Sequence, residues 1–190
     1  MENVDQGNGV FGERLIPCRA EALAPNHNWE KTWYLARLKG LDSECITFLW
    51  RLIHQILPTR NRLYRLNMPN IDNSDCPKCH TEENTLHIFT QCQENRIVFE
   101  WLFEKLRQCT IDLTEECVLL LDFKLSKVIP YNYLPLVWLT GNVFMRIWHY
   151  RQNKRICRLY ELRTDLEARI NLLRKTKYCE MGDFLHTLLG

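Results

Sequence analysis

The sequence predicts an all-α (helical) fold in which one short cysteine-containing knuckle lies between helices. Apolar residues recur at helical spacing over residues 43–57, 94–108 and 137–173. The knuckle, residues 76–92, falls between the first two of these segments. A chain of 190 residues with a hydrophobic share of 46% is long enough to bury a sizeable core.

The N-terminal third is expected to contain a loose arm and then two helices. Residues 1–28 carry glycine, proline and asparagine without a clear period, which is typical of a flexible arm. A helix is expected over Ser43–Leu57, because Ser43 can cap its start and Pro58 ends it. A short second helix is expected over Thr59–Leu66.

Three further helical segments are expected after the knuckle. One covers Glu94–Gln108, and Thr114 begins a run to Leu121 that fits either a helix or a strand. The apolar stripe from 137 to 173 would need a helix of nearly 40 residues, so we expect a kink or break within it. Tryptophans on these stripes are predicted to be core residues: Trp50, Trp101, Trp138 and Trp148.

These elements divide the chain into three regions. After the arm, residues 29–130 are expected to form the helical domain that carries the knuckle. Residues 131–190 are expected to form a long, basic, amphipathic C-terminal helix region.

The knuckle has the spacing of a metal site. Cys76 and Cys79 are separated by two residues, which lets a tight turn bring both thiolates to one ion. His87 and Cys92 supply a third and a fourth ligand. Because four soft or borderline protein ligands leave no position for water, the pattern predicts a structural Zn²⁺ site.

Two other interpretations of the same residues remain. The cluster is a coincidence if three of the nine cysteines and one histidine fall together by chance. The run Cys76-Pro77-Lys78-Cys79-His80 also fits a c-type haem attachment site, which would need export of the chain. On an ideal helix, positions five apart differ by about 140°, so a helix starting near Thr85 must end or kink before Cys92.

Composition narrows the setting of the protein. No apolar run approaches the roughly 20 residues that cross a bilayer, and the first residues lack the basic and apolar parts of a signal peptide. We expect an intracellular protein that binds neither a membrane nor a small-molecule substrate. No nucleophile, base or pair of carboxylates has a persuasive arrangement, so we expect no enzymatic activity.

The net charge of +2 conceals a strong segregation of charge. Residues 31–68 carry seven basic and two acidic side chains, and residues 146–177 carry ten basic and three acidic ones. Such segments fit either a surface that binds a polyanion or solvated helix faces. Candidate nucleic-acid-binding residues are Arg60, Arg62, Tyr64 and Arg65 before the knuckle, and Arg151, Lys154, Arg155 and Arg158 on one predicted helical stripe.

Three segments of the chain resemble one known family. Phe48–Leu63 is similar to the "fLWrl.h..LPTr.rL" stretch of the reverse-transcriptase zinc-binding domain. Glu83–Cys92 is similar to the family's Glu-Thr-x-x-His and final Cys, with Asn84 as one inserted residue. Phe144–Asn153 is similar to its "iW..RN" helix, although Gln152 splits the Arg-Asn pair.

The resemblance implies an origin and a role. The family lies near the C-terminal end of the polyprotein of LINE-type (non-LTR) retrotransposons, so this chain resembles a detached tail, either a remnant or a domesticated gene. The family implies an accessory module that binds RNA or DNA, with a polymerase or another protein as possible partner. It acts in the nucleus if it acts as the family does, and otherwise in the cytoplasm. The alternative is a zinc-stapled helical protein-protein interaction domain without nucleic-acid binding.

Overall fold

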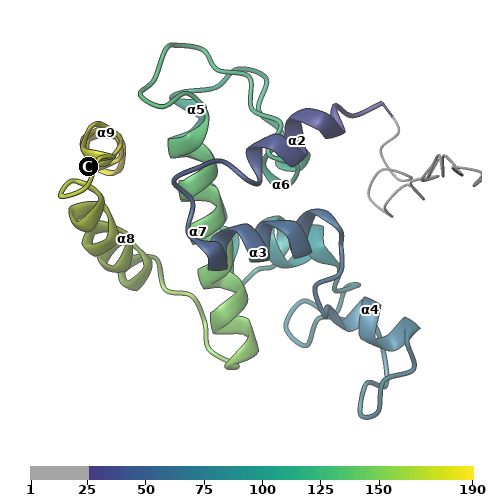
Figure 1. Ribbon diagram of the computed structural model, residues 1–190. Coiled ribbons are helices and arrows are strands. Elements are labelled where there is room, and N and C mark those ends of the chain that lie inside the picture. The colour runs from purple at the N-terminus through teal and green to yellow at the C-terminus, as the bar shows by residue number, and fades with distance from the viewer. Residues whose placement is uncertain (1–25) are drawn as a thin grey trace, which may run out of the picture.

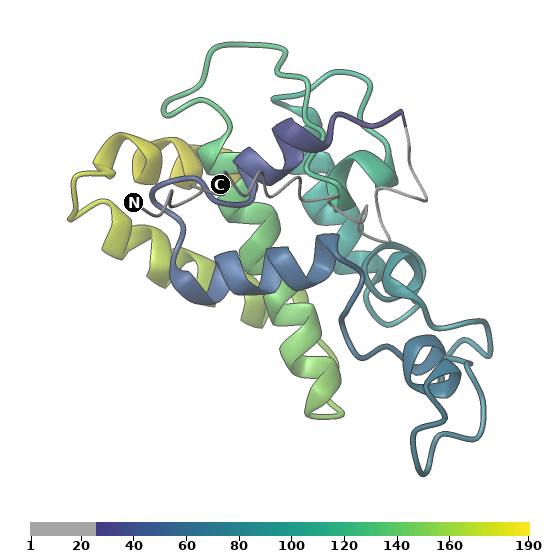
Figure 2. The same ribbon diagram turned by 45° about the vertical axis from the view of Figure 1, so that its right-hand side comes forward.

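Helix α7 (Leu134–Gln152) is the central helix of the computed structural model, which describes residues 26–190 (Figure 1, and turned by 45° in Figure 2). Thirteen of its nineteen residues are buried. Helices α3 (Ser43–Ile53) and α5 (Arg96–Arg107) pack against it, and so do α8 (Leu159–Leu173) and α9 (Cys179–Leu189), which also pack against each other. A helix buried on most sides is apolar around most of its circumference, as its sequence is.

The shorter elements connect this core. They are α2 (Trp29–Leu35), α4 (Arg60–Arg65), the π-helix η1 (His87–Gln91) and α6 (Glu115–Leu119). Within residues 26–190 there is no β-strand, and the extended pairing is confined to isolated bridges such as Asp75 with Glu82. The all-α prediction is therefore confirmed. None of the helices in these residues has the length and apolar content needed to cross a bilayer.

The crossing of α3 and α7 depends on a glycine. A Cβ atom at Gly141 would lie 2.4 Å from Sγ of the buried Cys45 and 3.4 Å from Cδ1 of Leu49. Only a residue without a side chain lets the two helices approach this closely. The result is a tight core interface between α3 and α7.

Phe89 anchors η1 in this core. Its ring is fully buried, with centroids 6.0 Å from Phe48 of α3 and 4.8 Å from Phe144 of α7. The π-helix also packs against α5. The knuckle is thus packed against both α3 and α5.

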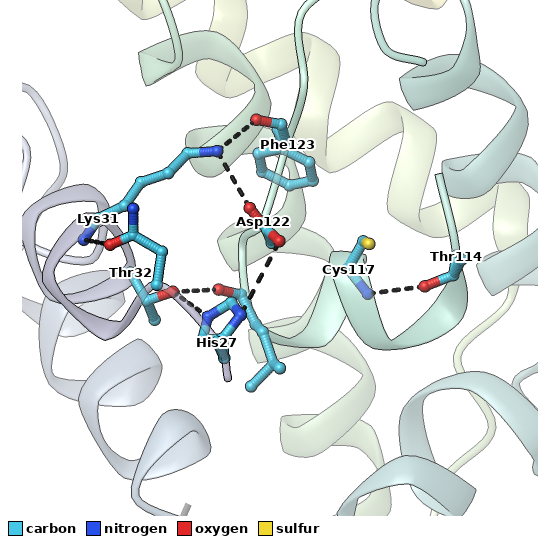
Figure 3. Close-up of polar contacts among 9 residues, drawn as sticks. His27, Lys31, Thr32, Thr114, Cys117, Asp122 and Phe123 are labelled. Atoms are coloured by element: carbon cyan, nitrogen blue, oxygen red, sulfur yellow. Dashed lines mark hydrogen bonds and ion pairs between the residues drawn. The ribbon is translucent and has the colours of Figure 1, made fainter. Parts of the chain in front are cut away.

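Polar contacts fix α2 to the segment after α6 (Figure 3). Lys31 Nζ donates to Asp122 Oδ1 at 3.1 Å and to the Phe123 carbonyl at 2.7 Å. Thr32 Oγ1 donates to the Leu120 carbonyl at 2.9 Å and lies 2.6 Å from Nε2 of His27. Because these contacts cross about 90 residues of sequence, they hold α2 against the body of the fold.

The long C-terminal helix is broken, as expected, and the break lies at residues 153–158. Asn153 is the C-cap of α7, and Lys154 adopts a left-handed backbone with φ 54°. Arg155 N–H donates to the Tyr150 carbonyl at 2.8 Å, and Lys154 N–H donates to Arg151 at 3.0 Å. These two bonds are those of a Schellman motif, which terminates a helix.

Several expectations were wrong in detail. Asp42, not Ser43, caps α3, because its side chain accepts from Cys45 N–H at 2.7 Å. Trp50 is not a core residue, since it is 47% exposed, whereas Trp138 and Trp148 are buried. Helices α2 and α9 were not predicted. The arm was predicted over residues 1–28. Residues 1–25 lie outside the described residues, and Asn28 caps α2.

Candidate metal centre

The first half of the knuckle is a tight turn around Cys76-Pro77-Lys78-Cys79. His80 N–H donates to the Cys76 carbonyl at 2.9 Å, and Cys76 N–H donates to the Thr81 carbonyl at 2.8 Å. His80 closes the turn with a left-handed backbone (φ 55°), and its side chain is exposed. The turn therefore directs the two cysteine side chains to the same side and leaves His80 outside.

The second half is a single π-helical turn. Asn84, the residue inserted relative to the family pattern, starts it by accepting from His87 N–H at 2.8 Å. Cys92 N–H donates to the His87 carbonyl at 2.6 Å, which is the i→i+5 bond of a π-helix. A π turn is wider than an α turn, so the five-residue spacing brings His87 and Cys92 to one side. The helix ends at Gln91, before Cys92, as the spacing required.

The four predicted ligands meet. One ligand atom from each of Cys76, Cys79, His87 and Cys92 lies within 4.8 Å of the others. Cys79 Sγ and Cys92 Sγ are 3.8 Å apart. Two thiolates bound at about 2.3 Å to a tetrahedral zinc ion are separated by about 3.8 Å, so this pair already has the spacing of a zinc site.

His87 presents one nitrogen that the protein leaves without a hydrogen bond. Its Nε2 is buried and has no hydrogen-bond partner, whereas Nδ1 lies 3.3 Å from Thr81 Oγ1. Burial lowers the pKa of His87, opposed by the nearby carboxylate of Glu83, so the ring is neutral near pH 7. A proton on Nδ1, held by Thr81, leaves the Nε2 lone pair for a metal.

The environment of the thiols also fits zinc. Burial raises the pKa of Cys92 to about 12, so a metal must displace its proton near neutral pH. Gln93 N–H donates to Cys79 Sγ at 3.3 Å, a bond that stabilises a thiolate. Lys78, within the turn, forms an ion pair with Glu94, in which Nζ lies 2.9 Å from Oε1. With three cysteines and one histidine, the site is closed by protein ligands and is of the structural type.

Glu83 joins the knuckle to two distant basic segments. Its side chain is almost fully buried, and Oε1 accepts from the Arg60 backbone N–H at 2.9 Å. The same carboxylate pairs with the guanidinium of Arg151, whose Nε lies 3.3 Å from Oε2. Arg151 also stacks on Trp148, with Cζ 5.0 Å from the ring centroid. We call this arrangement of Arg60, Glu83 and Arg151 the Glu83 junction.

The candidate nucleic-acid-binding residues lie on either side of the Glu83 junction. Arg60, Arg62, Tyr64 and Arg65 are on α4, where Tyr64 and Arg65 are exposed. The expected single stripe of Arg151, Lys154, Arg155 and Arg158 was wrong: only Arg151 lies on α7. Lys154 and Arg155 are in the turn that ends α7, and Arg158 is the N-cap of α8. The Schellman motif at Lys154 breaks the stripe.

Glu83 is the residue of this site that the sequence analysis did not single out. Its burial was not expected, because buried carboxylates are rare. The family resemblance could have pointed to this residue. Glu83 belongs to the motif around His87, and Arg151 belongs to the downstream helix motif. The structure brings these two motifs into contact.

The helical fold and the closed Cys3His cluster define a zinc-binding helical module. Residues 19–99 match the family described as zinc-binding in reverse transcriptase, and the resemblance is confirmed over these residues. The match contains all four ligand residues and ends before α7. The comparisons with curated proteins and with solved structures gave no match.

Proposed function

We propose that this chain is a non-catalytic accessory module, of retroelement origin, that binds RNA or DNA beside its zinc knuckle. The observation that carries the proposal is the Glu83 junction. It joins the start of basic helix α4 to the end of α7 at a residue four positions before His87. Two basic segments that are far apart in sequence are therefore held next to the same knuckle.

The side chains available to a polyanion support this. Lys154, Arg155 and Arg158 are exposed in the α7–α8 turn, and Tyr64 and Arg65 are exposed on α4. Arg155 and Arg158 approach Glu161 only at 3.8 and 3.9 Å, so that one carboxylate offsets only part of their charge. Exposed cations whose charge is only partly offset bind phosphates, and they gain affinity by releasing counterions.

The knuckle has a supporting role in this account. Zinc, when bound, supplies folding energy that holds residues 76–92 in place. Ser74 accepts from Glu83 N–H at 2.8 Å, and Glu83 in turn accepts from Asn61 N–H at 3.2 Å through its carbonyl. An ordered knuckle thereby fixes the orientation of α4. The four protein ligands leave no open position, which supports a role without catalysis.

The family resemblance supports a proposal for the location and the partners of the module. We propose an intracellular module, nuclear if it acts as reverse-transcriptase zinc-binding domains do, with a polymerase or another protein as a partner. The resemblance to the C-terminal part of LINE-type polyproteins supports descent from such an element, as a remnant or a domesticated gene. The choice between RNA and DNA is left to the binding experiment below.

A salt titration tests the proposal. Binding of the zinc-loaded protein to single-stranded RNA, single-stranded DNA and duplex DNA is measured by fluorescence anisotropy at several salt concentrations. Each neutralised phosphate contributes about 0.7–0.9 to the slope of log affinity against log salt. Replacing Lys154, Arg155 and Arg158 by Gln should therefore flatten the slope by up to about 2–3 while zinc content and helicity stay unchanged.

A control variant matched in charge makes the result specific. Replacing Lys124, Lys175 and Lys177 by Gln removes the same charge from exposed positions away from the Glu83 junction. This control should keep the wild-type slope. Equal slopes for the wild type and both variants, or no binding at low salt, would contradict the proposal. The protein-protein interaction domain then becomes the better assignment.

A further inference from the structure

A cavity of about 350 Å³ opens between α2 and α3, on residues that the metal site does not use. Trp33 and Arg37 line it from the α2 side, and Ile46, Trp50 and His54 line it from the α3 side. Trp50 is 47% exposed, although the apolar side chains on the opposite side of α3 are buried. A large exposed aromatic side chain at the edge of a cavity marks a surface that can bind a ligand.

Three aromatic rings, those of Trp33, Trp50 and His54, line the cavity. The His54 ring lies 4.6 Å from Trp33, at an interplanar angle of 28°, and 4.4 Å from Trp50. Trp33 stacks in turn on Trp29 at 5.8 Å. The four rings form one continuous series that ends at the half-exposed Trp50. A planar aromatic ligand can extend such a series, because offset stacking is favourable between rings.

The charge at the cavity is positive. Among the described lining residues, Arg37 is the only one with a charged side chain. Its Nε donates to the Trp33 carbonyl at 3.1 Å, which holds the exposed guanidinium at the rim. A planar ligand that also carries negative charge fits this combination better than an apolar peptide does.

The wall is held in a fixed position before any ligand arrives. Helix α2 is fastened through Lys31 and Thr32 to residues 120–123 (Figure 3). His27, in the same network, meets Trp29 edge-on with ring centroids 4.7 Å apart. A preorganised aromatic surface binds at a lower entropic cost than one that must be assembled.

We propose that this cavity binds an unpaired nucleobase of a single strand, stacked on Trp50, with the neighbouring phosphate at Arg37. The inference rests on the proposed function. It narrows the ligand to a single strand, because bases inside a duplex do not expose their faces. Stacking on aromatic side chains also tolerates any base, so sequence preference should be weak. Stacking of the base on Trp50 adds a contact that does not depend on salt to the salt-dependent phosphate contacts at Arg37 and at the Glu83 junction.

The test compares two strands of equal length, an oligothymidylate and a strand with abasic residues. Both carry the same phosphates, but only the first carries bases. The wild-type protein should bind the oligothymidylate more tightly. Trp50→Ala should weaken oligothymidylate binding on the order of 5- to 150-fold, as one lost stacking contact does, and leave abasic-strand binding unchanged. The slope against salt should not change.

Two further variants serve as controls. Trp50→Phe keeps an aromatic face and should keep most of the preference for bases, so a loss of folding in Trp50→Ala does not decide the outcome. Tyr34→Ala removes an exposed aromatic residue of α2 that does not line the cavity, and it should have no effect. Equal binding of both strands by the wild type, or an unchanged preference in Trp50→Ala, overturns the stacking site but leaves the proposed function standing. Binding of neither strand at low salt contradicts the stacking site, and the proposed function is contradicted as well if RNA and duplex DNA also fail to bind.

Discussion

Arg151, near the end of α7, pairs with Glu83 across 68 residues of sequence. The carboxylate of Glu83 is buried, and it also accepts the backbone N–H of Arg60. One buried charge thereby fixes the knuckle, α4 and α7 relative to one another. The central role of this pair has consequences that can be measured.

Removing one partner of this pair should destabilise the fold. Arg151→Ala leaves the Glu83 carboxylate buried with one backbone donor, so we expect a loss of about 2–3 kcal/mol in unfolding free energy. Glu83→Gln should cost less, about 1–2 kcal/mol, because the neutral amide still accepts from Arg60. Urea unfolding of zinc-loaded protein measures both values.

A double variant, Glu83→Gln with Arg151→Ala, provides the control. Because the two side chains interact directly, its loss should be smaller than the sum of the single losses by roughly 1 kcal/mol or more. Strictly additive losses would show that the two residues do not stabilise the fold together.

The close approach at Gly141 should reverse the usual effect of alanine in a helix. Gly→Ala in an open helix stabilises by about 1 kcal/mol, but here the new Cβ would collide with Cys45 Sγ. We expect Gly141→Ala to destabilise by about 1–2 kcal/mol, as overpacking does. In a Cys45→Ala background the same change should stabilise. Denaturation of the four proteins of this cycle measures the sign in each background.

The left-handed backbone at Lys154 predicts a stabilising substitution. Lysine at φ 54° is strained, and glycine is not. Lys154→Gly should therefore raise the unfolding free energy by about 0.5–1 kcal/mol, while weakening nucleic-acid binding through the lost charge. Gln152→Gly, two residues earlier in the helical turn, should have the opposite effect on stability. If Lys154→Gly and Gln152→Gly both lower the unfolding free energy, a left-handed backbone at Lys154 does not terminate α7.

His27 predicts a dependence of stability on pH. Burial lowers its pKa below 6.5, with Asp122 opposing the shift, and its side chain is 9% exposed. The unfolded chain therefore binds this proton at a higher pH than the folded chain does. The stability that the neutral ring contributes is complete above about pH 6.5 and is lost as the pH falls through the folded pKa.

The measurement compares urea midpoints at pH 7.5 and 5.5. The midpoint should fall further in the wild type than in His27→Gln, whose amide keeps a polar contact for Thr32. His186→Gln changes an exposed histidine of α9 and should behave like the wild type. An equal fall in wild type and His27→Gln would show that His27 does not carry the effect.

The sequence predicted the ligand set because the chemistry is local. Cys76 and Cys79 need only a tight turn, and few residue types bind zinc, so spacing alone identified the set. The π turn from His87 to Cys92 was not predicted, since five-residue spacing fits either a helix end or a kink. Only its backbone hydrogen bond distinguishes a π-helix from these.

What the sequence did not predict depends on tertiary contacts or on unusual backbone. The apolar period continues past Gln152, and no glycine marks the helix end at Lys154, so the break could be expected but not located. Trp50 has the spacing of a core residue, but its side of α3 borders the open cavity beside α2, which leaves the side chain 47% exposed. The contact of Glu83 with Arg151 joins two motifs that local patterns treat separately.

The most direct test of the central claim is the metal content of the purified protein. Elemental analysis of reduced, tag-free protein should find one zinc per chain. Cys92→Ser should lose the metal, whereas Cys179→Ser, which changes an exposed cysteine of α9, should keep it. Zinc near zero in the wild type, or full retention in Cys92→Ser, would contradict the metal centre on which the account depends.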